Sequence, residues 1–214
     1  MKILSSHQLP STFDPQALRG ELAHVRDDEW TLHFNTSDYE GGWSSAALMA
    51  VDGDPKNQTN ADGDFRPTEL LERCPVFRQV LDHFECDKRR VRLLKLDAGA
   101  RILEHIDSYV NMDFGEIRLH VPVQTDPKVE FYVDSKRVVM EAGTTWYIDA
   151  TFPHRLYNGS DIDRVHLVID CVANDWLRSQ FPSQLGAPSW YRRGAFYLRA
   201  TQFRLRRALR PSAA

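Results

Sequence analysis

Hydrophobic residues recur with two different periods along the chain, and the change of period divides it into regions. In residues 13–26, Leu18, Leu22 and Val25 are spaced as they would be on one face of a helix. Residues 68–87 show the same helical spacing again. These two segments predict helices in the N-terminal part of the chain.

From residue 89 the period falls to two, and short apolar runs alternate with turns. A short strand is also expected at 30–34. Six or more short strands within about 80 residues indicate a mainly β sandwich, barrel or jelly roll with flanking helices, and not a βαβ fold. The six runs are residues 91–97, 116–122, 129–133, 137–140, 145–149 and 165–171.

Residues 35–67 interrupt this regularity, because they are polar and glycine-rich around a short apolar stretch at 46–51. Long irregular stretches of this kind are typical of functional loops, so we predict a mobile lid over the mouth of the barrel. The expected organisation has three parts: N-terminal helices and lid packed on the barrel over residues 1–88, a catalytic β core over 89–172, and a basic C-terminal segment over 173–214.

Composition and charge narrow the class of protein. The chain of 214 residues is 42% hydrophobic with a net charge of −3, which suits one globular unit and does not favour a nucleic-acid partner. The charge is uneven, because residues 176–214 hold eight arginines and no acidic residue, and 190–210 has helical character. The three cysteines have no CxxC spacing, and no signal-peptide or membrane-length apolar run is present, so we expect reduced thiols in a cytoplasmic protein.

Two histidines and an aspartate have the pattern of a metal site. In His105-Ile-Asp107, residues i and i+2 of a strand point to the same face, and His154 follows an apolar run that can deliver a third ligand. Two imidazoles and one carboxylate suit Fe(II) and leave positions open for a keto acid and O2. Arg164, ten residues further on, is placed to hold the far carboxylate of 2-oxoglutarate. The pattern predicts an Fe(II)- and 2-oxoglutarate-dependent oxygenase.

Two expected strands carry cationic groups on one face and aliphatic groups on the other. Arg118 and His120 share one face of the strand at 116–122, and Arg164, directly before the strand at 165–171, shares a face with His166. Buried charge is costly without a partner. A solvated outer face is one explanation, but two such strands beside the candidate ligands favour a polar cavity inside the barrel.

Four motifs, in order and at matching spacings, resemble the aspartyl/asparaginyl β-hydroxylase family, and within it the bacterial L-proline cis-4-hydroxylases. The likeness extends upstream to residues 37–43 and to Arg92, and it covers roughly residues 34–172. The four motifs are LDAGARILEHID at 96–107, IRLHVP at 117–122, WYIDATFPH at 146–154 and DRVHLVID at 163–170.

The resemblance implies a double-stranded β-helix, the jelly-roll fold of the cupins, and conversion of 2-oxoglutarate and O2 to succinate and CO2 during hydroxylation. It implies the same three iron ligands and the same role for Arg164. It also implies that His120 lies near the other end of 2-oxoglutarate and that Trp146 is a wall of that pocket. Arg92, Arg118 and Trp43 fall where relatives hold the carboxylates or side chains of cosubstrate or substrate.

The substrate is the part on which the alternatives stay open. With Arg164 assigned to 2-oxoglutarate, Arg92 and Arg118 are available for a second carboxylate, and Trp43 and Tyr39 can form an apolar wall once the lid closes. We expect a free or carrier-tethered, proline-like amino acid. Hydroxylation of peptidyl aspartate or asparagine is an alternative, and so is a non-catalytic, metal-binding β-barrel module whose basic C-terminus docks an acidic partner. The relatives have a longer C-terminal part, and such elements commonly cover the active site.

Overall fold

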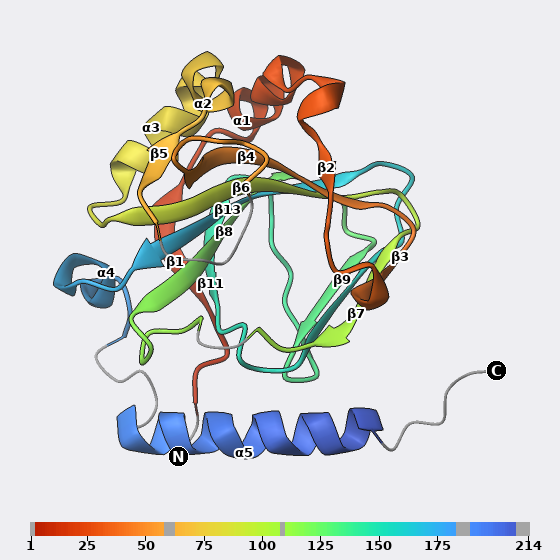
Figure 1. Ribbon diagram of the computed structural model, residues 1–214, viewed down its shortest axis with the longest axis vertical. Helices are drawn as coiled ribbons and strands as arrows, with labels where there is room; N and C mark the ends of the chain where they lie inside the picture. Colours follow the sequence, from red (N-terminus) through yellow and green to blue (C-terminus); the bar gives the residue numbers. More distant parts are fainter. Residues whose placement is uncertain (1–2, 58–62, 108–109, 183–188, 209–214) are drawn as a thin grey trace.

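Two β-sheets face each other in the computed structural model, which describes residues 3–57, 63–107, 110–182 and 189–208 (Figure 1). The strand order of the larger sheet is β1-β11-β8-β13-β6-β4-β2, with β5 beside β4. Its strands are β1 (Ser6–Thr12), β2 (Thr31–Leu32), β4 (Trp43–Val51), β5 (Phe65–Pro67), β6 (Lys88–Leu96), β8 (Glu116–Gln124), β11 (Thr144–Ile148) and β13 (Arg164–Val172).

The smaller sheet has the order β10-β9-β12-β7-β3, and all its pairings are antiparallel. Its strands are β3 (Tyr39–Glu40), β7 (Arg101–His105), β9 (Val129–Val133), β10 (Lys136–Arg137) and β12 (His154–Asn158). Two facing antiparallel sheets make a jelly roll, the double-stranded β-helix that the sequence predicted.

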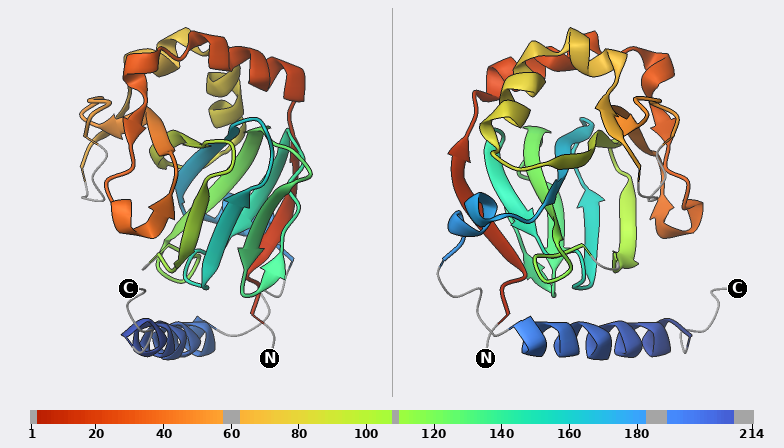
Figure 2. Two further views of the ribbon diagram at one scale, coloured as in Figure 1. Left: turned by 90° about the vertical axis from the view of Figure 1, so that its right-hand side faces the viewer. Right: turned by 60° about the vertical axis from the view of Figure 1, so that its left-hand side comes forward.

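The helices lie outside the sheets (Figure 2). The first three cover the outer face of the larger sheet, and α5 lies below the barrel in Figure 1. Among the described residues, no helix is long and apolar enough to cross a membrane. The helices are α1 (Pro15–Glu21), α2 (Glu69–Arg73), α3 (Pro75–His83), α4 (Asp175–Ser179) and α5 (Ser189–Ala208), with 3-10 turns η1 (Leu22–His24), η2 (Asp27–Glu29) and η3 (Thr36–Asp38).

Strands β6, β8 and β13 separate two environments, because alternate side chains point to opposite faces. Their aliphatic residues pack with α1–α3 in one hydrophobic cluster, in which Leu93, Leu119 and Leu167 are fully buried. The alternate residues, among them Arg92 and His166, point between the two sheets, where they are also buried. The alternation in the sequence therefore correctly predicted a polar interior.

The predicted lid at 35–67 is wrong over its middle part. Trp43–Val51 forms β4, a nine-residue strand that pairs with β6 along most of its length and carries Ala46 and Leu48 into the core. Its Ser and Ala residues have little β propensity, so the strand is held by its neighbours and by burial. The flanking segments hold only short elements, the turn η3 and the strands β3 and β5, and residues 58–62 lie outside the described part of the chain.

Other predicted elements differ from the structure at their ends. The helix expected at 68–87 is two helices separated at Cys74, because Pro75 can begin a helix but cannot continue one. The helix expected at 13–26 ends at Glu21 and continues as a 3-10 turn. The strands expected at 30–34 and 137–140 shrink to two-residue strands.

The C-terminal helix α5 packs against the loop before β8. Phe196 and Ala200 are buried on its inner face, and the ring of Phe196 lies edge-on to Phe114, with the centroids 5.2 Å apart. Arg192 donates from Nε to a carboxylate oxygen of Asp113 at 2.6 Å. These contacts explain why a strongly basic segment lies on this part of the protein.

Candidate metal centre and cofactor cavity

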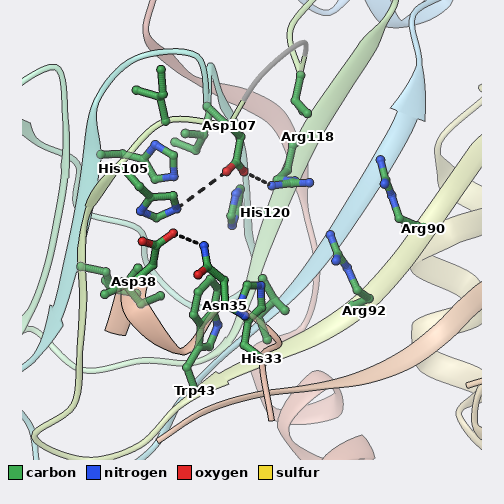
Figure 3. A pocket seen from close by; sticks show the side chains of 18 of the residues that line it. His33, Asn35, Asp38, Trp43, Arg90, Arg92, His105, Asp107, Arg118 and His120 are labelled. Atoms are coloured by element: carbon green, nitrogen blue, oxygen red, sulfur yellow. Dashed lines mark hydrogen bonds and ion pairs between the residues drawn. The ribbon is translucent and has the colours of Figure 1, made fainter. Parts of the chain in front are cut away.

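His105, Asp107 and His154 come together at one end of the smaller sheet, where one ligand atom from each lies within 4.8 Å of the others. Figure 3 shows His105 and Asp107 facing each other. The two histidines are cross-strand partners: His105 ends β7 and His154 begins β12, and their ring centroids are 4.2 Å apart. Asp107 follows two residues after the end of β7. Sequence reasoning placed the pair on one strand, but the carboxylate lies just beyond it.

Backbone carbonyls orient both imidazoles in the same way. Nδ1 of His105 lies 2.8 Å from the carbonyl oxygen of Leu103, and Nδ1 of His154 lies 3.0 Å from that of Phe152. A carbonyl can only accept, so each Nδ1 carries a proton, and in the neutral ring the lone pair is then on Nε2. Hydrogen bonding of the remote ring nitrogen is a usual feature of metal-binding histidines.

Asp107 is held from two sides. Its backbone N–H donates to the carbonyl oxygen of Ala150 at 2.8 Å, which ties it to the loop that leads to His154. On the side chain, Nη1 of Arg118 donates to Oδ2 at 2.6 Å, while Oδ1 lies 3.8 Å from Nε2 of His105. One carboxylate oxygen is therefore engaged by a guanidinium, and the other faces the imidazoles.

The electrostatics of the site favour the protonation states that a metal requires. Burial, assisted by His105, lowers the pKa of His154 to about 4, so its ring is neutral near pH 7. Burial alone would raise the pKa of Asp107, but Arg118 and the two histidines outweigh it and lower that pKa. Neutral imidazoles and an ionised carboxylate are the forms that bind a cation.

The three side chains line a cavity of about 580 Å³ between the sheets. Eight of the ten residues that the sequence pointed to line it: Trp43, Arg92, His105, Asp107, Arg118, His120, His154 and Arg164. The other two, Tyr39 and Trp146, are not among its lining residues. Trp146 packs at the edge of the hydrophobic cluster between the sheets, and its indole N–H donates to Thr144 Oγ1 at 3.0 Å.

Arg164 lines the cavity and is 4% exposed. Its Nη2 lies 2.8 Å from Nδ1 of His166, and its Nε has no hydrogen-bond partner among the described residues. Burial lowers the pKa of Arg164 to about 9, and no carboxylate in the described part of the chain offsets that cost. A buried guanidinium in this situation favours binding of an anion.

Two more lining residues have spare hydrogen-bonding capacity. His120 stands opposite Trp146 in the strand pairing; its Nδ1 is buried without a described partner, and burial and Arg164 lower its pKa well below the usual value. Arg92 reaches Asp170 only through one long contact of 3.3 Å, and its Nε is likewise without a described partner. Burial lowers the pKa of Arg92 to about 10.

Arg118 is much more fully engaged than Arg92. Its Nε donates to Oδ1 of Asp170 at 2.7 Å and its Nη2 to Oδ2 at 3.1 Å, while Nη1 holds Asp107. Asp170 is fully buried and also accepts from Arg90 Nε at 3.1 Å. Burial would raise the pKa of Asp170, but the three surrounding guanidinium groups hold it well below its usual range.

The aromatic wall of the cavity contains a residue that the sequence did not reveal. The His33 ring stacks on Trp43 with centroids 3.6 Å apart, and Phe34 stacks on His33 at 4.6 Å. Tyr39 stands edge-on to Trp43 and donates its hydroxyl to the carbonyl oxygen of His33 at 3.3 Å. Tyr39 thus supports the stack from behind. His33 lies in a segment that only long-range pairing brings to the cavity, so no local pattern identified it.

A second group of potential metal ligands, Glu21, His24 and Cys74, lies on the helical side of the larger sheet. There the Glu21 carboxylate accepts hydrogen bonds from the backbone N–H groups of Val76 and Phe77, so it caps α3. Burial raises the pKa of Cys74 to about 12, which keeps the thiol protonated. This group is explained by helix capping.

Comparison with known proteins identifies the family of the chain. Residues 12–174 match the aspartyl/asparaginyl beta-hydroxylase family, and the chain belongs to that family. An L-proline cis-4-hydroxylase of Rhizobium meliloti (strain 1021) is 27% identical over 182 residues, which cover 82% of this chain and 64% of that protein. The chain therefore spans less than two thirds of the length of this relative.

Solved structures show a likeness of fold. An oxidoreductase of the 2OG-Fe(II) oxygenase family from Burkholderia pseudomallei has a TM-score of 0.54 at 15% identity, covering 80% of this chain and 88% of its own. The non-haem alpha-ketoglutarate dependent carbocyclase SnoK of nogalamycin biosynthesis has a TM-score of 0.54 at 12% identity, covering 78% and 79%. Both confirm the double-stranded β-helix, which accommodates more than one reaction.

Proposed function

We propose that this protein is an Fe(II)- and 2-oxoglutarate-dependent hydroxylase whose iron ligands are His105, Asp107 and His154. The donor set supports iron, because two imidazoles and one carboxylate leave coordination positions open for a keto acid and O2. When bound, iron and 2-oxoglutarate supply the oxidation of a substrate C–H bond by O2, with release of succinate and CO2. The protein's own residues bind and orient the partners of that reaction.

The observation that carries this proposal is the buried guanidinium of Arg164 in the cavity of the ligand triad. Nothing in the described chain neutralises Arg164, and its fork of N–H groups matches a carboxylate. His166 fixes one nitrogen of the guanidinium, so the remaining donors point in a defined direction. In the proposal, the distal carboxylate of 2-oxoglutarate binds here and His120 contacts the cosubstrate.

The substrate in the proposal is a free or carrier-tethered, proline-like amino acid. Arg92 is the candidate for its carboxylate, because this buried cation has spare donors and lines the same cavity. The stack of His33 on Trp43 supplies an apolar wall that excludes water. The relationship to an L-proline cis-4-hydroxylase supports this choice of substrate.

Anaerobic titration tests the cofactor part of the proposal. Adding Fe(II) and then 2-oxoglutarate is expected to produce a visible metal-to-ligand charge-transfer band, and Arg164→Lys is expected to require more 2-oxoglutarate for the same band. Absence of the band, together with tight Zn(II) binding, would instead support a non-catalytic metal-binding module.

A substrate panel tests the rest. Free L-proline, other amino acids and aspartyl or asparaginyl peptides are compared by succinate release and by a product mass increased by one oxygen atom. We expect a free amino acid to give the largest coupled turnover. Coupled turnover of a peptide alone would reject the proline-like substrate and retain the oxygenase.

A further inference from the structure

Two arginines of the cavity, Arg118 and Arg92, differ in the hydrogen bonds that they donate. Arg118 donates three hydrogen bonds to two carboxylates, Asp107 and Asp170, and is 13% exposed. Arg92 donates one long hydrogen bond and keeps an unpartnered Nε. The two guanidinium groups therefore differ in the capacity that they have left for a ligand.

From this difference we infer that Asp170 is a positioning residue, which acts through Arg118 to present a single oxygen of Asp107 to the metal. The inference rests on the proposed function, because it concerns the same metal site. It also assigns Arg118 to the metal site and not to the substrate carboxylate, which leaves that carboxylate to Arg92.

The geometry supports each step of this connection. Asp170 is fully buried and accepts from both Nε and Nη2 of Arg118, a two-point contact that fixes the plane of the guanidinium. The remaining edge of that plane points at Asp107, where Nη1 binds Oδ2 (Figure 3). Oδ1 is then the oxygen on the side of His105. Occupying Oδ2 disfavours two-oxygen binding by Asp107, so positions stay open for other ligands.

The contact between Asp170 and Arg118 also changes the charge close to the metal site. Arg118 carries a positive charge close to a site for a cation, which alone would weaken metal binding. The Asp170 carboxylate offsets part of this charge without touching the site, since the contacts between Asp170 and Arg118 are on the far side of the guanidinium. Partners of this kind behind a metal ligand typically change metal affinity by about 10–100-fold when removed.

The test is a Mn(II) titration of the protein without 2-oxoglutarate, followed by electron paramagnetic resonance of the free ion. Arg118→Lys keeps the charge but cannot reach both carboxylates at once, so it isolates positioning. We expect it to weaken Mn(II) binding by about 10-fold. Asp170→Asn is expected to weaken it at least as much, because it also leaves the charge of Arg118 uncompensated. The double variant should be little worse than Asp170→Asn, since both changes break one connection.

Arg90→Lys is the matched control, because Arg90 contacts the same Asp170 at 3.1 Å but makes no hydrogen bond or ion pair with Asp107 among the described contacts. Its Mn(II) affinity should stay within about twofold of the unmodified protein. Thermal unfolding without metal is recorded for every variant. If Asp170→Asn does not fold, Arg118→Lys still decides the outcome.

Two results would overturn the inference while leaving the proposed function intact. One is unchanged Mn(II) affinity in Arg118→Lys with a raised KM for the amino acid, which would make Arg118 a substrate anchor. The other is a lower unfolding temperature with unchanged Mn(II) affinity in both variants, which would make Asp170 purely structural. Failure of the unmodified protein to bind Mn(II) or Fe(II) would instead reject the proposed function itself.

Discussion

The two faces of the larger sheet are both largely buried but have different roles. On the face toward α1–α3, strands β6, β8 and β13 present aliphatic side chains that are almost entirely excluded from solvent. On the face toward the smaller sheet, the same strands present arginine, histidine and aspartate, also buried. Burial by itself therefore does not mark a structural core. What distinguishes the faces is whether polar groups are satisfied by the protein or left for a ligand.

The two faces contribute to the stability of the fold with opposite signs. Each aliphatic side chain on the helical face contributes favourable free energy by leaving water. On the cavity face, Arg164 and His120 keep buried atoms without described partners, which costs stability until a ligand binds. Substitutions on the helical face should therefore lower the free energy of unfolding and leave turnover unchanged. Substitutions on the cavity face should change ligand binding or turnover and leave the free energy of unfolding nearly unchanged.

The largest effect is expected from His154→Ala. Loss of one of the three proposed ligands should weaken metal binding by more than ~100-fold and abolish turnover. About 100-fold is the largest effect usual for a residue that only hydrogen-bonds to a metal ligand. The apoprotein should stay folded, because the imidazole lies at the end of a strand. Mn(II) titration and succinate release measure the effect. His24→Ala, in the group that caps α3, is the control, and full affinity in His154→Ala would contradict the assignment.

On the opposite face, Leu167→Ala should lower stability by about 2–5 kcal/mol, because it leaves a cavity among fully buried side chains. The unfolding temperature should then fall by roughly 5–15 °C, while succinate formation per folded molecule stays unchanged below the transition. Differential scanning calorimetry and an assay at low temperature separate the two quantities. A proportional loss of activity at full folding would show that the two faces are coupled.

Arg164→Lys tests directly whether the unpartnered donors on the cavity face bind a ligand. A lysine keeps the charge but loses the paired donors, and a charge-assisted hydrogen bond is worth about 1.5–3 kcal/mol. The KM for 2-oxoglutarate should therefore rise ~10–100-fold. The same substitution at Arg101, whose side chain is 53% exposed, serves as the comparison. Equal KM values in the two variants would remove Arg164 from the cosubstrate site.

The smallest effect concerns Asp149, in the loop between β11 and His154. Burial raises its pKa to about 6, above the usual value near 3.8, so the folded state binds this proton more tightly than the unfolded state. The stability from this group is greatest at low pH and is lost as the pH rises to about 6. Asp149→Asn has no carboxyl group at this position, so its stability does not fall in this way as the pH rises. The stability of the variant relative to the unmodified protein should therefore grow by about 1–2 kcal/mol between pH 4.5 and pH 7.5.

Thermal unfolding at the two pH values measures this difference, and any constant cost of the amide cancels. Asp161→Asn, at a side chain that is 96% exposed, is the control. A difference independent of pH would show that Asp149 is not the buried acid that its surroundings predict.

Local patterns were enough to predict the interior of the cavity. The alternation of apolar and polar residues on β8 and β13 could be recognised because each strand is long and its two faces differ sharply in polarity. The three proposed ligands and Arg164 stood out by residue type and spacing, and the structure brings them into one cavity. Residue type and spacing were enough to identify these residues, although their meeting depends on cross-strand pairing such as that of His105 with His154.

Features that depend on distant pairing were not predicted. β4 looked like part of a lid because its Ser and Ala residues become a strand only beside β6. The edge strand β1 was missed because its sequence, with Pro10, is polar. His33 could not be identified, since its role follows from how residues 31–40 cross the barrel. Tyr39, which we expected to form a wall with Trp43, packs against Trp43 but is not among the residues that line the cavity. The engagement of Arg118 by Asp170 joins residues 52 positions apart.

One carboxylate shared by three guanidinium groups also restricts how this protein can change over evolutionary time. Replacing Asp170 alone would leave Arg90, Arg92 and Arg118 without their common counterion, and replacing Arg118 alone would leave Asp107 unsupported. Substitutions at these positions are therefore expected to arise together, through compensating pairs. New substrate preferences should emerge more readily at His33 and Phe34 of the aromatic wall, whose positions depend on ring stacking.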